Sequence, residues 1–427
     1  MPTPRSTATV RSPATIEAMT KLVRGLPHPA DFQAPPSDLD RDRWTQADAS
    51  ARPTRLRRLR DRMAAAGVDA YFGIRSEHMR YLTGFVLDDG EDKVAGHSGR
   101  FLVSAEEVVL LADSRYRLQA AAQAAGTRIE NTTYDLAAIW PNLVKSLGAR
   151  RVAVEAALVS HQLWQQLQAA APEVELVEAV GWVEADRVVK EPAEIERIKA
   201  ACAVADRALA AIVRRIRPGQ TERELAMALE WEIRSGGADA LAFGVACLAG
   251  SNAALPHGSP STSEAHVGRV LLFDFGAMVA GYRSDMTRTL FVGEPNPRDV
   301  AIYEIVAAAQ DASIARLDAA LRGEQTVPGG READAVARAV IETAGHGEHF
   351  GHGTGHGIGL ATHELPSLSR AGGDDPLPSP TVFSVEPGIY LDGVTGVRIE
   401  DLVLFDRGRE AVERLTNFPR HILSVGV

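Results

Sequence analysis

The sequence predicts two domains of different classes: an α/β domain followed by an α+β domain with internal pseudo-symmetry. A chain of 427 residues is too long for one ordinary hydrophobic core. Residues 54–187 alternate apolar strand-like runs with helical runs, which is typical of an α/β domain. In residues 188–427 the order helix, helix, strand, strand occurs roughly twice, which suits an α+β domain made of two related halves.

The α/β domain is expected to open with an amphipathic helix from Leu56 to near Gly67, in LRRLRDRMAAAGVDAYFGI, which continues into an apolar strand. Further strand-like runs are FLVSAEEVVLLA, RVAVEAALV and VELVEAV, and they alternate with helical runs such as SHQLWQQLQAAAP. These runs contain no cluster of catalytic residue types. Candidate catalytic residues therefore lie in the second domain.

Residues 1–53 are predicted to form an extended or disordered N-terminal arm. Eight of the 23 prolines fall in this stretch, and it lacks a sustained apolar period.

The α+β domain is expected to begin with a long helix near Pro192, because proline is favourable in the first turn of a helix. Thr221 followed by Glu224 is a capping pattern that opens a second helix. Apolar strands are expected around residues 242–250 and 269–275, and the runs FSVEPGIYL and GVRIEDLVLF are expected to be the closing strands.

Composition excludes several classes of function. A net charge of -10 and a pI near 5.7 argue against nucleic-acid binding, which needs a basic surface. No apolar run reaches the roughly 18 residues of a membrane span, and the N-terminus lacks the apolar core of a signal peptide. Cys202 and Cys247 stand in apolar surroundings, which predicts buried, reduced thiols and a cytoplasmic protein.

The stretch GHGTGHGIGLATHE, residues 351–364, combines five glycines with three histidines. Glycine disfavours a helix by about 1 kcal/mol per residue, so an extended or looped segment is expected. If the segment is extended, its glycines face one side, where another backbone could approach, and the opposite face carries His352, Thr354, His356, Ile358 and Leu360. His363 has the opposite parity and joins them only if the chain bends. A glycine-rich phosphate loop is less favoured, because no clear strand-to-helix context surrounds it.

Carboxylates interrupt the neighbouring apolar runs at Asp274, Asp285, Glu386 and Glu400. An ionised carboxylate is costly to bury alone, so a cation is expected beside them; turn caps or surface residues are the alternatives. Arg398 and Glu400 share one strand face while Asp401 points away, although a plain surface ion pair is also open.

Histidine is the commonest protein metal ligand, so His356 joins these four carboxylates as a candidate ligand. Oxygen-rich sites suit Mn²⁺, and one divalent ion would leave four carboxylates under-neutralised. Two ions about 3.5 to 4 Å apart, bridged by carboxylates, would balance the charge.

The sequence resembles the pita-bread metallopeptidases, which include Xaa-Pro aminopeptidase, prolidase and methionine aminopeptidase. LPHGSPS, FDFGAMVAGYRSDMTRT, GHGTGHGIGLATHELP, VEPGIY and GVRIED occur in that family's order and spacing, from about residue 190 to the end. MRYLTGF and DSRYRLQA resemble, less sharply, the creatinase-type N-terminal domain of the proline-specific members.

This resemblance implies a role for each matching residue. Asp274 and Asp285 would hold one divalent ion and Asp285, His356 and Glu386 the other, with Glu400 bridging. Glu386 would also take the proton from the attacking water. His257 and His363 would contact the substrate and stabilise the gem-diolate, and His352 and Arg398 would lie near the proline pocket. The leaving nitrogen must also be protonated, and a histidine near its unperturbed pKa suits this role, so His363 is the candidate donor. Many relatives carry an acidic residue where this chain has Ala361-Thr362, which bears on peptide preference.

The expected activity is that of an Xaa-Pro aminopeptidase acting on short proline-containing peptides, with two Mn²⁺ ions, or Co²⁺ or Zn²⁺, in a homodimer. An Xaa-Pro bond has no N–H, and metal ions would polarise its carbonyl without needing one. The alternatives are an Xaa-Pro dipeptidase (prolidase), a non-peptidase amide hydrolase, or a binding protein on the same fold. Methionine aminopeptidase fits less well, because it does not need the preceding α/β domain.

Overall fold

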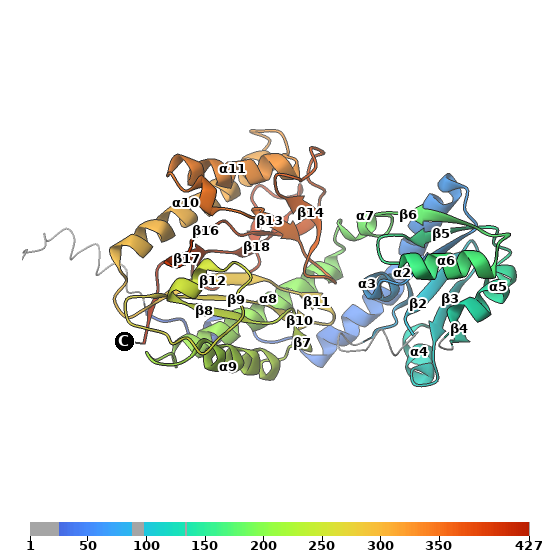
Figure 1. Ribbon diagram of the computed structural model, residues 1–427, viewed down its shortest axis with the longest axis horizontal. Helices are drawn as coiled ribbons and strands as arrows, with labels where there is room; N and C mark the ends of the chain where they lie inside the picture. The colour runs from blue at the N-terminus through green and yellow to red at the C-terminus, as the bar shows by residue number, and fades with distance from the viewer. Residues whose placement is uncertain (1–24, 88–97, 133–134, 427) are drawn as a thin grey trace, which may run out of the picture. The chain divides into compact units, whose positions relative to one another are not determined.

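The computed structural model describes residues 25–87, 98–132 and 135–426 (Figure 1). The chain divides into two compact units. The smaller unit comprises residues 37–189, and the larger unit comprises residues 25–36 together with 190–426. The smaller unit has the predicted α/β class and the larger unit the predicted α+β class.

The smaller unit is built on one six-stranded sheet with the order β4-β3-β2-β1-β5-β6. β1 pairs with β2 antiparallel and with β5 parallel. The core contains the ring of Phe72, packed against that of Trp140 at a centroid distance of 5.2 Å. The strands are β1 (Ala70–Gly73), β2 (Arg100–Ser104), β3 (Val108–Ala112), β4 (Arg128–Asn131), β5 (Arg151–Glu155) and β6 (Glu175–Ala179). The helices are α2 (Asp38–Ala66), α3 (Ser76–Thr83), α4 (Arg117–Gln123), α5 (Leu136–Ser146), α6 (His161–Ala170) and α7 (Glu184–Arg187).

Helix α2 corrects the expected N-terminal arm of residues 1–53. It begins at Asp38, capped by Ser37, and ends at Gly67 as predicted. Seven of the eight prolines precede Ser37, and the eighth, Pro53, lies inside the helix. Residues 1–24 of the expected arm lie outside the described residues.

Residues 25–36 pack on the larger unit. The guanidinium of Arg207 donates to the carbonyl oxygen of Pro29 at 2.8 Å, and the ring of Phe32 stacks on that of Phe418. This segment also contains the short 3-10 helix η1 (Pro29–Asp31).

The larger unit contains the two predicted helix pairs, each followed by strands (Figure 1). In Figure 1, α10 and α11 lie on one side of the strands, and α8 and α9 on the other. The helices are α8 (Pro192–Val213), α9 (Glu222–Ser235), α10 (Pro297–Leu321) and α11 (Gly330–Thr343), with 3-10 helices η2 (Gly250–Ala254) and η3 (Gly347–His349). Thr221 caps α9 and shares a capping box with Glu224, as predicted.

The strands of the larger unit form small, mostly antiparallel sheets with the orders β20-β12-β9-β8, β14-β13-β15-β18-β19, β11-β10-β7 and β16-β17. The first half contributes β7 (Ala240–Leu241), β8 (Ala246–Ala249), β9 (Val270–Phe275), β10 (Ala277–Val279), β11 (Tyr282–Arg283) and β12 (Met286–Val292). The second half contributes β13 (Gly355–Gly357), β14 (Glu364–Leu368), β15 (Thr381–Val385), β16 (Gly388–Leu391), β17 (Thr395–Arg398), β18 (Asp401–Phe405), β19 (Glu413–Arg414) and β20 (Ser424–Val425).

Each of the two expected closing strands is in fact two strands. FSVEPGIYL divides into β15 and β16 around Glu386-Pro387, and GVRIEDLVLF divides into β17 and β18 around Ile399-Glu400. Proline cannot donate to a sheet ladder, which accounts for the first break. Both expected ligand glutamates therefore stand at strand breaks.

Cys202 and Cys247 are free and buried, as predicted. Among the described residues, no helix combines the length and apolar character needed to cross a membrane.

Candidate functional site

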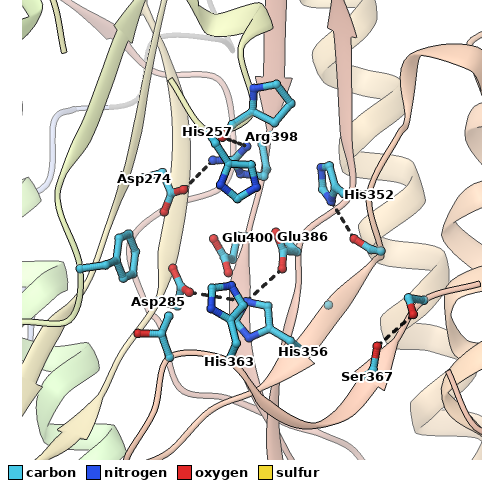
Figure 2. Close-up of a pocket in the computed structure, with 16 residues that line it drawn as sticks. His257, Asp274, Asp285, His352, His356, His363, Ser367, Glu386, Arg398 and Glu400 are labelled. Carbon is cyan, nitrogen blue, oxygen red and sulfur yellow. Dashed lines mark hydrogen bonds and ion pairs between the residues drawn. The ribbon is translucent and has the colours of Figure 1, made fainter. Parts of the chain in front are cut away.

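All nine predicted site residues line one cavity of about 410 Å³ in the larger unit (Figure 2). They come from segments as far apart as residues 257 and 400, which the two halves of the unit bring together. They are His257, Asp274, Asp285, His352, His356, His363, Glu386, Arg398 and Glu400. The sequence did not single out Phe243, Pro256, Ser367 and Ser369, which also line the cavity.

The two aspartates come from one antiparallel hairpin. Asp274 lies in β9, opposite Thr287 of β12. The chain then turns at Ala280 and Gly281, both of which have positive φ, and returns to place Asp285 just before β12. The turn expected near these two residues is thus present and brings both carboxylates to the cavity.

The glycine-histidine segment is extended only over Gly355–Gly357, where it forms β13. A Cβ at Gly355 would collide with the carbonyl oxygen of Ser384, and one at Gly357 with that of Leu365. The expectation that these glycines admit a neighbouring backbone is confirmed.

The single extended face expected in this segment is only partly present. His352 and His356 line the cavity, whereas Thr354 is buried against Asp334, to which it donates at 2.9 Å. A register shift follows His356, and the chain then bends. The bend brings the ring of His363 to 4.2 Å from that of His356, measured between centroids.

Five side chains form the inner cluster of the cavity. Asp285, His356 and Glu400 each offer a ligand atom, and these atoms all lie within 4.8 Å of one another. His356 Nε2 lies 3.7 Å from Asp285 Oδ2 and 3.3 Å from Glu386 Oε1. Asp274 adjoins them and pairs through Oδ2 with Arg398 at 2.6 Å. Figure 2 shows these groups converging on a common space.

Some carboxylate oxygens of the cluster lack a hydrogen-bond partner among the described residues. Asp274 Oδ1 and Glu400 Oε1 are buried and have no hydrogen-bond partner among the described residues. Burial raises the pKa of Asp285 and Glu400 well above the usual range, and the neighbouring carboxylates raise it further. Buried polar groups are normally paired, so these oxygens call for a cation. The donor set of carboxylates and one imidazole fits a divalent metal.

Glu386 differs from its neighbours. Burial raises the pKa of Glu386, but the neighbouring His356, His352 and Arg398 lower it by more, and the net result is a lowered pKa. Ser384 also donates to its Oε1 at 3.0 Å. Glu386 thus differs from Asp285 and Glu400 in the direction of its pKa shift.

Two histidines outside the cluster, His352 and His363, have shifted pKa values. Burial lowers the pKa of His363, and the neighbouring His356 and His257 lower it further. Burial likewise lowers the pKa of His352. The pKa of His363 is thus shifted below the unperturbed value that suits a proton donor.

Tyr390 was missed by the sequence interpretation, although it ends the quoted motif VEPGIY. Its hydroxyl lies 2.8 Å from His352 Nε2 and accepts from Arg398 at 2.7 Å. It therefore joins the two residues that were expected near a proline pocket. An aromatic residue in an apolar strand gives no separate signal in sequence.

Comparison with known proteins matches the two units to two family models. Residues 55–189 match the creatinase/prolidase N-terminal domain, and residues 196–407 match metallopeptidase family M24. An uncharacterized peptidase of Bacillus subtilis is 33% identical over 370 residues, which cover 86% of this chain and 99% of that protein.

Two solved structures are also similar. An Xaa-Pro dipeptidase from Bacillus anthracis is 34% identical with a TM-score of 0.78, over 87% of this chain and 99% of that one. An X-Pro aminopeptidase from Thermotoga maritima is 34% identical with a TM-score of 0.72, over 84% and 98%. These matches confirm the predicted fold and the predicted enzyme class, a metallo-exopeptidase. This chain belongs to metallopeptidase family M24, with a creatinase/prolidase N-terminal domain before its peptidase domain.

Proposed function

We propose that this enzyme hydrolyses the bond before proline in short peptides, using two divalent ions held by Asp274, Asp285, His356, Glu386 and Glu400. The observation that carries this proposal is the set of buried carboxylates whose oxygens stay open toward one cavity. When bound, such ions would supply Lewis acidity to the scissile carbonyl and lower the pKa of water. Mn²⁺ is the preferred candidate, because oxygen donors dominate the set.

The side chains around the cluster supply the remaining functions. Glu386, whose pKa is lowered by the neighbouring His356, His352 and Arg398, accepts the proton of the attacking water. His257 and His363 reach the cavity from separate segments and orient the substrate by hydrogen bonds. His352 and Arg398 line the cavity and are linked through the Tyr390 hydroxyl, and the proline ring would pack against these two side chains.

Among proline-specific peptidases, we place the dipeptidase ahead of the aminopeptidase expected from sequence. Relatives named Xaa-Pro dipeptidase from Pyrococcus horikoshii and Lactobacillus delbrueckii are 38% and 40% identical over 56% and 50% of this chain, which supports this order. A panel of Xaa-Pro, Xaa-Pro-Xaa and Xaa-Ala-Xaa peptides with Mn²⁺, Co²⁺ or Zn²⁺ tests it. Cleavage of Xaa-Pro alone is expected; cleavage of Xaa-Pro-Xaa would restore the aminopeptidase, and cleavage of Xaa-Ala-Xaa alone would overturn proline specificity.

The three histidines of residues 351–364 provide a sharper test. His356→Ala should lose bound metal and activity together. His363→Ala should keep its metal and lose mainly kcat, by about 10²- to 10⁴-fold if His363 is a general acid and by less if it only orients the substrate. His352→Ala should keep its metal and lose mainly kcat/KM for proline peptides. Metal analysis beside kinetics separates the three; equal metal loss in all of them would indicate a purely structural cluster.

A homodimer and a cytoplasmic location remain predictions made from the sequence. Light scattering of the purified chain tests the first, and cell fractionation tests the second.

A further inference from the structure

Beneath the cavity, two segments of the chain each pass between the five-stranded sheet and the two-stranded sheet. Val385 ends β15 opposite Asp401, the first residue of β18, in the five-stranded sheet. Gly388 begins β16 opposite Arg398, the last residue of β17, in the two-stranded sheet. Glu386 and Glu400 stand in the two gaps. No continuous strand pairing holds the backbone at Glu386 and Glu400. The direction of both carboxylates therefore depends on the backbone geometry of these two gaps.

One side chain of α10 spans both gaps. Gln310 is fully buried, and its Nε2 donates to the carbonyl oxygen of Val385 at 3.0 Å and to that of Ile399 at 3.3 Å. Val385 immediately precedes Glu386, and Ile399 immediately precedes Glu400. A single amide thus ties together the backbone on which both carboxylates are mounted.

Arg420 fixes the orientation of this amide. Its Nη1 donates to Gln310 Oε1 at 2.7 Å. A guanidinium has donors only, so it must face the amide oxygen, and the amide nitrogen must face the carbonyl oxygens.

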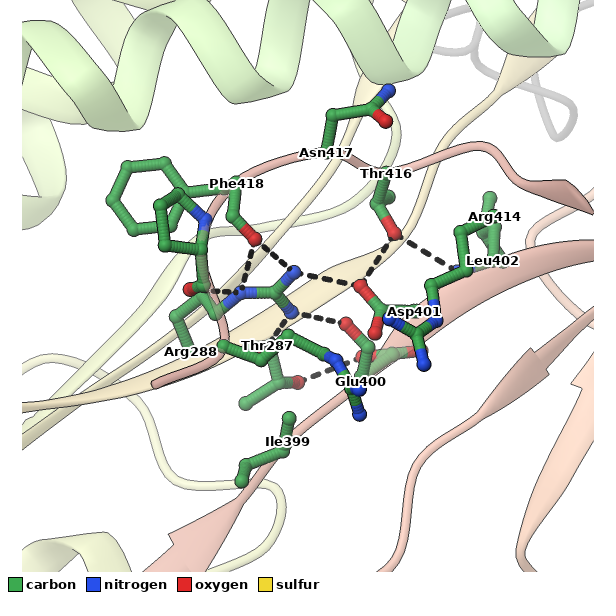
Figure 3. Close-up of polar contacts among 12 residues, drawn as sticks. Thr287, Arg288, Ile399, Glu400, Asp401, Leu402, Arg414, Thr416, Asn417 and Phe418 are labelled. Atoms are coloured by element: carbon green, nitrogen blue, oxygen red, sulfur yellow. Dashed lines mark hydrogen bonds and ion pairs between the residues drawn. The ribbon is translucent and has the colours of Figure 1, made fainter. Parts of the chain in front are cut away.

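A second set of contacts holds the Glu400 side of the link (Figure 3). The guanidinium of Arg288 donates to the carbonyl oxygen of Glu400 and, at 2.6 Å, to Asp401 Oδ1. Thr416 donates to the same Asp401 oxygen at 2.7 Å. The other oxygen, Asp401 Oδ2, accepts from Gln310 Nε2 at 3.1 Å. Gln310 is therefore also part of the buried hydrogen-bond network of Arg288, Asp401 and Thr416.

We propose that Gln310 is a positioning residue of the metal centre, which sets the separation and direction of Glu386 and Glu400 through their backbone. The proposal rests on the proposed function, in which these glutamates bind divalent ions. A competing account is that Gln310 only satisfies buried carbonyl oxygens, which would stabilise the fold without affecting metal affinity.

Gln310→Met separates these accounts, because methionine has a similar length but no donor. Outer partners of metal ligands typically change metal affinity by 10- to 100-fold, and we expect roughly a tenfold loss for a residue acting through the backbone. Ser313→Ala is the matched control. Ser313 is buried one turn further along α10, and its hydroxyl donates to Ala309 of the same helix.

The experiment is a Mn²⁺ titration of the chelator-treated full chain, with thermal unfolding of each metal-free variant alongside. A weaker Mn²⁺ affinity in Gln310→Met than in both wild type and Ser313→Ala supports the proposal. Wild-type affinity in Gln310→Met with a lowered unfolding temperature overturns it in favour of the competing account. Absence of Mn²⁺ binding by the wild-type chain would instead overturn the proposed function.

Should Gln310→Met fail to fold, Arg420→Met decides the question. This change leaves Gln310 in place but removes the contact that orients its amide. A loss of Mn²⁺ affinity of about threefold or more supports the proposal, and wild-type affinity overturns it.

Discussion

Both units bury carboxylates, but Glu155 of the smaller unit and the cavity cluster of the larger unit differ in how their oxygens are partnered. In the smaller unit, each oxygen of Glu155 accepts from two groups at 2.6 to 2.8 Å: Tyr71 Oη, His78 Nδ1, and the backbone N–H groups of Ile74 and Arg75. In the larger unit, Asp274 and Glu400 each keep one buried oxygen without a hydrogen-bond partner among the described residues.

The pKa values follow this difference. Burial opposes the ionisation of Glu155, but the hydrogen bond and charge of His78, with the other donors, outweigh burial and lower its pKa. Burial and like charges raise the pKa of Asp285 and Glu400 instead. A carboxylate whose donors are all within the protein stabilises the fold. A cluster of buried carboxylates whose oxygens lack hydrogen-bond donors destabilises the metal-free protein and favours the binding of a cation.

The largest effect is expected from Asp285→Asn. Loss of this proposed shared ligand should remove bound metal and lower activity by roughly 10³-fold or more, because the Lewis acid contributes several kcal/mol. The metal-free variant should nevertheless be at least as stable as metal-free wild type, since one of the mutually repelling buried carboxylates is gone.

Metal analysis, kinetics and thermal unfolding of the same sample check Asp285→Asn. Two tightly bound ions in the variant would refute the ligand assignment. A much lower unfolding temperature of the metal-free variant would contradict the contrast between the two units.

The carboxylates of the cavity could be predicted because each interrupts an apolar run, and the histidines because of the glycine-rich segment and the order of the motifs. Asp274 and Glu386 stand out in this way, and motif order supported the set. Gln310 could not be predicted in this way, because in sequence a glutamine inside a helix resembles a solvent-facing residue. Its partners lie 75 or more residues away along the chain.

Two features of the fold could not be predicted from the sequence for similar reasons. The first half of α2 is rich in charged residues and Trp44 is its one buried residue, so no apolar period marked it. The strand breaks at Glu386 and Glu400 lie inside continuous apolar runs, so the pattern predicted single strands. Pairing with different sheets divides them, and pairing is a tertiary property.

An intermediate effect is expected from Glu155→Gln, which keeps the shape but turns an NH₂ group toward donors. The smaller unit should lose about 3 kcal/mol of unfolding free energy, because the carboxylate that accepts from four buried or half-buried donors is lost and donors are left unsatisfied. Urea unfolding followed by tryptophan fluorescence measures this loss. Trp182, stacked on Tyr71, is a reporter in the same unit.

Lowering the pH should reduce the difference in unfolding free energy between Glu155→Gln and wild type. A carboxylate with a lowered pKa in the folded state contributes its stability above the ordinary glutamate pKa, about 4.3, and loses it as the pH falls through the folded value. The difference in unfolding free energy should therefore shrink as the pH falls below about 4.3. A gap that widened on acidification would show that Glu155 is not held as the anion.

The smallest effect is expected from Asp113→Asn, which tests a carboxylate that is well partnered but close to solvent. The hydrogen bond from Arg115 lowers the pKa of Asp113 to about 2, against the opposing effect of burial and with help from Ser98. Asp113 is 19% exposed and Arg115 is 55% exposed. Water competes for such a pair, so the substitution should cost less than about 1 kcal/mol at pH 7. That cost should begin to fall near the ordinary aspartate pKa, about 3.9, and vanish as the pH passes through 2. Urea unfolding at pH 7 and pH 3, beside Glu155→Gln, provides the measurement. If Asp113→Asn cost as much as Glu155→Gln, the number of hydrogen bonds and not burial would set the value of a carboxylate in this unit.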